Sequence, residues 1–290
     1  MDDRVSDTGI DALEQGRAFV DLSGWRKVLV GGSEAAGWLH DLVTADVADL
    51  GPGRARRSLL LTPTGRIRAD FTVVRRDDVT LLQAPDQEPV DLMLEPYVLS
   101  SDVRLDDVTE SMSLFALLEG VLRDREHFIP SPWGVGSGLV AAIGPDTDRL
   151  RTELAAAGLA EASEAVLDVW RIRKGIARMV VDFGADSLPA DVGLEWTIDG
   201  SKGCFLGQES FARVRNMGHP TSALVHVRAG QPLRANEPVL ADGLPVGSLT
   251  SVVEDADEGW TALARIGWRA VGEALSTDSG IRLTSVVDAD

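Results

Sequence analysis

The chain has 290 residues, a formal net charge of −18 and a single cysteine. Nucleic acids and anionic membranes attract basic surfaces, so this charge argues against stable nucleic-acid binding and membrane binding. The length exceeds one typical core, which predicts two or three domains. A lone cysteine excludes an internal disulfide, and the acidic N-terminus lacks the apolar stretch of a signal peptide, so we expect a cytoplasmic protein.

The first part of the chain predicts a tail followed by mixed α and β elements. Residues 1–17 are expected to form a disordered tail. The stretch RAFVDLSGWRKVLVGG predicts a β-hairpin that turns at Ser23-Gly24. Three strands then follow at 55–63, 65–76 and 79–85, separated by turn residues. The middle strand alternates, which places Asp70 on the face opposite the apolar one.

The pattern restarts near residue 113 and changes again near residue 221. Two apolar strands and two helices are predicted between 113 and 175, one helix running from an Asp146 cap to Gly158. After Pro220, short strands recur about every ten residues with glycine and proline between them, which is typical of a small β-barrel or sandwich. Strands and helices without strict alternation indicate an α+β fold.

The stretch KGCFLGQE holds the only cysteine, Cys204. The stretch CFLGQESFARVRNM predicts a helix whose first turn holds this thiol. The helix dipole and the neighbouring Lys202 would then favour a reactive thiolate. The glycines at 203 and 207 permit close backbone approach or unusual dihedral angles. The alternative is that Cys204 is a small buried hydrophobic residue, which local physics favours slightly.

Two acidic positions also have a functional and a structural interpretation. Asp70 either forms an ion pair with Arg68 on the same face, or lies in a cleft where it holds or abstracts a proton. Asp191 and Trp196 either bind a flat, amine-bearing heterocycle or form a capped turn over a core indole. The four histidines are scattered, so with one cysteine no metal-ligand set is expected.

The chain resembles the YgfZ family, folate-binding proteins of the glycine-cleavage T-protein (aminomethyltransferase) superfamily. The most specific match is KGCFLGQESFAR, which includes Lys202, Gly203, Cys204, Gly207, Gln208, Glu209 and Arg213. Glu209 and Arg213 stand four residues apart, the spacing of a helical ion pair. Weaker similarities cover nearly the whole chain, in VGGSEAAGWLHDLVTADVADL, LLTPTGRIRADFTVVR, YVLSSDVRLDDV, WRIRKGIAR and LPADVGLEWTID.

The resemblance implies a T-protein-like ring of two α/β-sandwich-type domains and a C-terminal antiparallel β-barrel. In this chain, residues 18–112 with 163–220 would form the folate-binding domain, 113–162 a second α+β domain, and 221–290 the barrel. Tetrahydrofolate or a one-carbon derivative would bind near Asp70, Asp191 and Trp196. T-proteins have an aspartate where Asp70 stands, whereas the superfamily often has a glutamate where Asp191 stands.

The resemblance predicts a tetrahydrofolate-binding accessory protein for iron–sulfur cluster assembly or repair, with Cys204 as its functional residue. Its partners would be iron–sulfur client enzymes or assembly proteins. The first alternative is a folate-dependent aminomethyltransferase or methyltransferase with Asp70 as acid/base or electrostatic residue. T-proteins have no cysteine at this motif position and usually have arginine where Gln208 stands. The second alternative is an interaction scaffold that binds no ligand.

Overall fold

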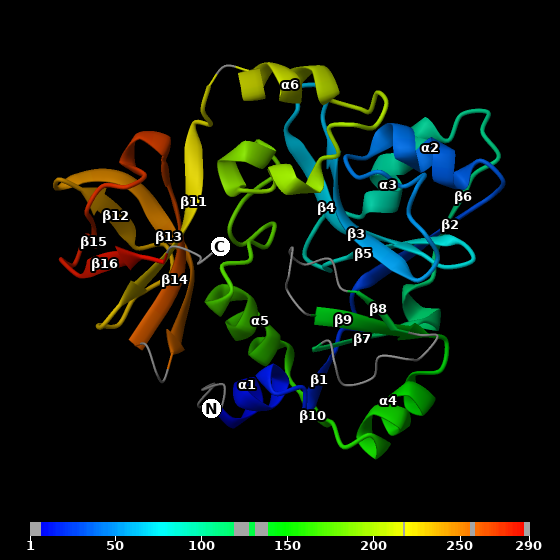
Figure 1. The fold of residues 1–290 in the computed structure, drawn as a ribbon, viewed down its shortest axis with the longest axis horizontal. Helices are drawn as coiled ribbons and strands as arrows, with labels where there is room; N and C mark the ends of the chain where they lie inside the picture. Colours follow the sequence, from blue (N-terminus) through cyan, green and yellow to red (C-terminus); the bar gives the residue numbers. More distant parts are fainter. Residues whose placement is uncertain (1–6, 119–127, 131–138, 217, 256–258, 287–290) are drawn as a thin grey trace. The chain divides into compact units, whose positions relative to one another are not determined.

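The computed structural model describes residues 7–118, 128–130, 139–216, 218–255 and 259–286 (Figure 1). The chain divides into two compact units. The first contains Met1–Leu61, Ala69–Asp168 and Thr197–Leu206, and the second contains Thr62–Arg68, Val169–Trp196 and Gly207–Asp290. No described helix is both long and apolar enough to cross a bilayer.

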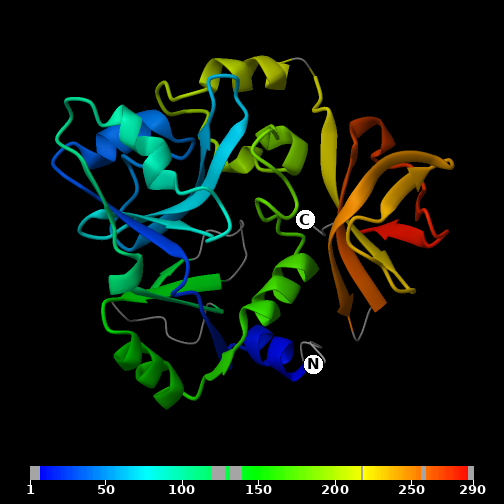
Figure 2. The ribbon, with the colours of Figure 1, turned by 180° about the vertical axis from the view of Figure 1, so that it is seen from behind.

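A five-stranded sheet with the order β3-β4-β5-β2-β6 forms one layer of the first unit. Its strands are β2 (Arg26–Gly31), β3 (Arg54–Leu61), β4 (Ile67–Arg75), β5 (Val79–Gln83) and β6 (Arg104–Asp107). Helices α2 (Ala35–Leu42) and α3 (Val90–Leu94) lie beside this sheet (Figure 1, Figure 2). Their buried side chains share one hydrophobic core with those of the sheet. Short 3-10 turns follow at Glu95–Tyr97 and Thr109–Ser111.

The alternation of β4 is confirmed on its apolar side. Ala69, Phe71 and Val73 all lie in the core beneath α2 and α3. The opposite side is also buried, because Asp70 and Thr72 are 8% and 4% exposed. Asp70 therefore lies in the protein interior, where an ion pair has a larger effect on stability than a surface pair.

A second five-stranded sheet has the order β10-β1-β7-β9-β8. Its strands are β1 (Ala18–Asp21), β7 (Ser113–Leu118), β8 (Phe128–Pro130), β9 (Leu139–Gly144) and β10 (Ala160–Ala162). Helix α4 (Thr147–Ala156) packs Leu150 and Leu154 into its core. As predicted, the Asp146 carboxylate caps this helix by accepting a hydrogen bond from Arg149 N at 2.9 Å.

Two expectations for the N-terminal region are wrong. The segment around Ser23-Gly24 is not a β-hairpin, because β1 pairs with β7 and β10 while β2 pairs with β5 and β6. Part of the expected tail is ordered as α1 (Asp7–Glu14). Ile10 and Leu13 of this helix are buried, and tertiary packing stabilises a short helix that would be marginal alone.

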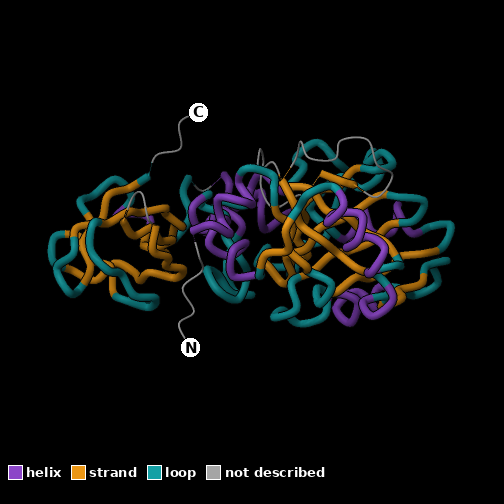
Figure 3. Tube along the Cα trace, turned by 90° about the horizontal axis from the view of Figure 1, so that it is seen from below, coloured by secondary structure: helices purple, strands orange, loops and turns teal. Residues whose placement is uncertain are grey.

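The second unit contains a closed barrel with the strand order β11-β14-β13-β12-β15-β16 (Figure 3). The described strand pairs of the barrel are antiparallel, and its inward side chains form a separate core. Its strands are β11 (Ser222–Ala229), β12 (Pro238–Ala241), β13 (Leu244–Asp255), β14 (Gly259–Gly267), β15 (Leu275–Thr277) and β16 (Arg282–Ser285). The remaining elements are α5 (Glu164–Arg173), α6 (Gln208–Asn216) and 3-10 turns at Pro189–Val192, Glu195–Thr197 and Trp268–Ala270.

A buried ion pair fastens α5 to the barrel within the second unit. Arg171 donates to Asp182 at 2.7 Å and to Ser251 Oγ of β13 at 2.9 Å. The hydroxyls of Thr250 and Ser251 both donate to Asp182 Oδ1 at 2.6 Å. The Asp182 side chain has no exposed surface, so its negative charge is stabilised by these hydrogen-bond donors and not by water. No local sequence pattern indicates this network, because Ser251 lies 80 residues after Arg171 in the chain.

Candidate functional site

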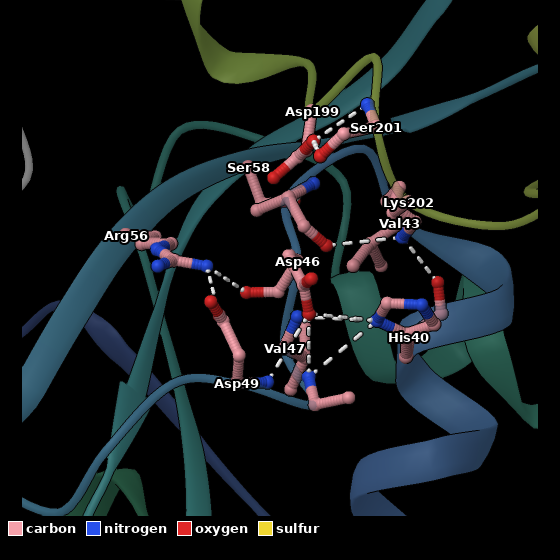
Figure 4. Close-up of polar contacts among 12 residues, drawn as sticks. His40, Val43, Asp46, Val47, Asp49, Arg56, Ser58, Asp199, Ser201 and Lys202 are labelled. Carbon is pink, nitrogen blue, oxygen red and sulfur yellow. Dashed lines mark hydrogen bonds and ion pairs between the residues drawn. The ribbon is translucent and has the colours of Figure 1, made fainter.

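The lysine of the KGC motif is buried against the C-terminal end of α2 (Figure 4). Its ammonium donates to the carbonyl oxygens of His40, of Val43 at 2.6 Å and of Ala45 at 3.0 Å. An ammonium has three N–H donors, so all three are used here. A cation is also favourable beside the carbonyls that end a helix. Burial lowers the pKa of Lys202 to about 8, while nearby carboxylates, chiefly Asp46, act in the opposite direction.

The turn that receives Lys202 is itself fixed by polar contacts (Figure 4). Arg56 Nη1 donates to Asp46 O and to Asp49 Oδ1, each at 2.6 Å. Asp46 Oδ1 accepts a hydrogen bond from Ala48 N at 2.9 Å and lies 3.1 Å from His40 Nδ1. Lys202 therefore contacts carbonyl groups whose positions are already set.

The loop that carries the motif is held on both sides of the cysteine. Before it, Asp199 N donates to Thr44 O at 3.0 Å, and Ser201 donates to Asp199 Oδ1 from its amide and its hydroxyl. These hydrogen bonds lower the pKa of Asp199. After it, Phe205 is buried with its ring centroid 5.2 Å from the Lys202 ammonium, and Leu206 packs against the core of the first sheet.

Between these anchors, the thiol of Cys204 is free and exposed. The expectation that the first turn of a helix holds this thiol is wrong, because α6 begins four residues later, at Gln208. Gly207 has φ 84°, a left-handed conformation. The right-handed helix α6 therefore does not extend through this residue toward Cys204. Lys202 is expected from the sequence to favour a thiolate at Cys204. In the structure its three N–H groups donate to backbone carbonyl oxygens instead. The structure thus places Cys204 on an anchored loop.

The other motif residues have distinct local environments. Glycine at 207 is explained by its left-handed backbone, whereas a Cβ added at Gly203 would meet nothing within 4 Å. Gln208 starts α6 and Glu209 is exposed. The Arg213 side chain lies outside the described part of the structure, so its predicted pairing with Glu209 stays a prediction.

The partner of Asp70 is Arg57 of β3, and not Arg68 as the structural alternative supposed. Arg57 Nε donates to Asp70 Oδ1 at 2.9 Å, and Nη2 donates to Oδ2 at 2.6 Å. The two side chains are only 7% and 9% exposed. This is the bidentate geometry in which arginine binds carboxylates most strongly. Arg57 could not be singled out in the sequence, because it stands among several arginines in RARRSLLL.

The second acidic position has the geometry of a capped turn. Asp191 is 3% exposed, and its Oδ1 accepts hydrogen bonds from Thr221 N at 3.0 Å and Ser222 N at 3.1 Å. Its Oδ2 accepts one from Leu188 N at 3.2 Å. Trp196 is 43% exposed, so it is not the core indole of the structural alternative and has surface available for stacking. A role of either residue in folate binding stays a prediction.

The site residues fall into separate groups. Asp70, Lys202 and Cys204 lie in the first compact unit, whereas Asp191 and Trp196 lie in the second. The hydrogen bonds of Asp70 and those of Lys202 involve different residues. Across the described residues, no group of three or more histidine, cysteine, aspartate or glutamate side chains is arranged to bind a metal ion.

The architecture is similar to that of a glycine cleavage system aminomethyltransferase. The GCVT N-terminal domain family matches residues 4–119. The crystal structure of glycine cleavage system aminomethyltransferase T from Bartonella henselae has a TM-score of 0.82 to this chain. It is 20% identical and the match covers 96% of this chain and 87% of the other. The expected α+β fold with a C-terminal β-barrel is confirmed.

Curated relatives are transferases by name. A chloroplastic protein of Arabidopsis thaliana, named as a transferase, is 26% identical over 275 residues, covering 84% of this chain and 64% of the relative. An aminomethyltransferase of Chlorobium chlorochromatii is 23% identical over 250 residues, covering 74% and 68%. This chain therefore spans about two thirds of the length of these relatives. The comparisons therefore show the fold, together with a GCVT N-terminal domain match over residues 4–119.

Proposed function

We propose that this chain binds tetrahydrofolate, or a one-carbon derivative of it, and acts as a folate-dependent aminomethyltransferase or methyltransferase of the T-protein type. The observation that carries the proposal is the likeness of fold to a glycine-cleavage aminomethyltransferase over 96% of the chain. The match to the GCVT N-terminal domain and the aminomethyltransferase relatives support the same chemistry. The donor substrate and any partner proteins are part of the proposal.

Each candidate residue has a role in this proposal that its environment permits. Asp70 supplies a carboxylate beside the reacting nitrogen of the folate. The exposed indole of Trp196 offers a surface for stacking a flat ring. Asp191 holds the turn Pro189–Val192 against the start of β11 through the hydrogen bonds that its two oxygens accept.

A turnover assay tests the transferase directly. Purified protein is incubated with tetrahydrofolate and either an aminomethylated lipoyl carrier or a small N-methyl donor, and the folate product is measured by mass spectrometry. Turnover in the wild type that is lost in Asp70→Asn supports the proposal. Binding of folate without turnover of either donor class counts against the transferase and leaves the accessory role.

A second candidate is the accessory role in iron–sulfur cluster assembly or repair that the KGC motif suggests. The observation that favours it is the exposed Cys204 thiol, which lies between the buried Lys202 and Phe205. A side chain on an anchored loop is presented to a partner at little cost in conformational entropy. In a strain that lacks this protein, Cys204→Ala should then fail to restore iron–sulfur enzyme activity although it folds. Full restoration by that variant would refute this candidate.

A further inference from the structure

Asp70 is fixed both through its side chain and through its backbone. Arg57 binds both carboxylate oxygens, and the backbone of Asp70 forms a second pair of hydrogen bonds with the amide of Gln87. Gln87 Nε2 donates to Asp70 O at 2.9 Å, and Gln87 Oε1 accepts from Asp70 N at 3.1 Å. The carboxylate therefore has neither rotational nor backbone freedom to change its direction.

The bidentate contact with Arg57 fixes the direction of the Asp70 carboxylate and leaves it able to accept a hydrogen bond from a ligand. An ionised carboxylate has about four lone-pair sites, so it can accept further hydrogen bonds while Arg57 occupies one site on each oxygen. Removing either side chain would break an ion pair whose partners, Arg57 and Asp70, are only 7% and 9% exposed.

We propose that Arg57 is a positioning residue for the ligand: it holds Asp70 as a fixed hydrogen-bond acceptor for an N–H group. This inference rests on the proposed folate binding. The ligand group that fits is an uncharged or cationic N–H donor. A carboxylate or phosphate of the same ligand would be repelled at this position.

The test is a calorimetric titration with folinic acid on the wild type, Arg57→Lys, Asp70→Asn and the double variant Arg57→Lys/Asp70→Asn. Arg54→Lys is the matched control, because Arg54 is an exposed arginine on the same strand. Lysine keeps the charge of Arg57 and lacks its planar fork, so Arg57→Lys is the variant expected to fold. Melting temperatures are recorded for every variant.

We expect Arg57→Lys to bind folinic acid about tenfold more weakly than the wild type, the loss associated with one charge-assisted hydrogen bond. The control should bind as the wild type does, and the double variant no more weakly than Asp70→Asn, since Arg57 acts only through Asp70. Folded Arg57→Lys with wild-type affinity, or additive losses in the double variant, would overturn the inference while leaving folate binding intact. Absence of binding by the wild type would overturn the proposed function and this inference with it.

Discussion

Replacing Lys202 by methionine removes the ammonium that joins the cysteine loop to the end of α2. Methionine keeps most of the aliphatic side chain but leaves the carbonyls of His40, Val43 and Ala45 without their shared donor. Each unsatisfied buried carbonyl costs roughly 1 kcal/mol or more, which gives a loss of about 3 kcal/mol for the three. Relief from burying the charged ammonium offsets part of this, so we expect a net destabilisation of about 2 kcal/mol.

Urea denaturation of Lys202→Met measures this loss as a change in the free energy of unfolding. Lys174→Met is the matched control, because Lys174 is exposed and the same substitution there should change stability by less than about 0.5 kcal/mol. Amide hydrogen exchange should also rise in residues 199–206 of the Lys202 variant. If Lys202→Met unfolds at the same urea concentration as the control, with unchanged exchange in this loop, the ammonium does not hold the loop in place.

The pKa of Lys202 is about 8 in the folded state and 10.5 in the reference state, so the unfolded chain binds more protons between these pH values. The free energy of unfolding of the wild type should therefore rise by about 1–2 kcal/mol relative to that of Lys202→Met between pH 8 and 10.5. A difference between the two unfolding free energies that does not change with pH would contradict this. Val180 is an exposed β-branched residue with φ 74°; Val180→Gly should raise stability by about 1 kcal/mol in thermal unfolding, whereas Val181→Gly should lower it. Asp182→Asn removes the counter-ion of a buried guanidinium and should cost about 3 kcal/mol in denaturant unfolding, while exposed Asp186→Asn should cost almost nothing, and equal losses would refute the buried-pair argument.

Local sequence signals predicted the elements whose structure is decided locally. The alternation in β4 placed Ala69, Phe71 and Val73 on the core face because side chains of a strand alternate whatever its neighbours are. Asp146 marked the start of α4 because its carboxylate bonds an amide only three residues away. The short strands and regularly spaced turns after Pro220 predicted the barrel in the same way.

The failures involve partners that lie far away in the chain. A turn at Ser23-Gly24 indicated a hairpin, yet the strands on either side pair with segments about 50 to 140 residues distant. The motif located Cys204, but the carbonyls that bind Lys202 lie about 160 residues before it. No local pattern could identify Arg57 as the partner of Asp70, because several arginines flank it and only the sheet decides which one is adjacent.

A titration of the wild-type protein with folinic acid shows directly whether this chain binds folate. Calorimetry should show saturable binding, and the melting temperature should rise because a ligand that binds only the folded state adds about 2.7 kcal/mol of stability at 100 times its dissociation constant. Para-aminobenzoylglutamate, which lacks the pteridine ring, is the control and should produce a much smaller rise. No heat of binding, together with a melting temperature unchanged by folinic acid, would show that the chain does not bind folate.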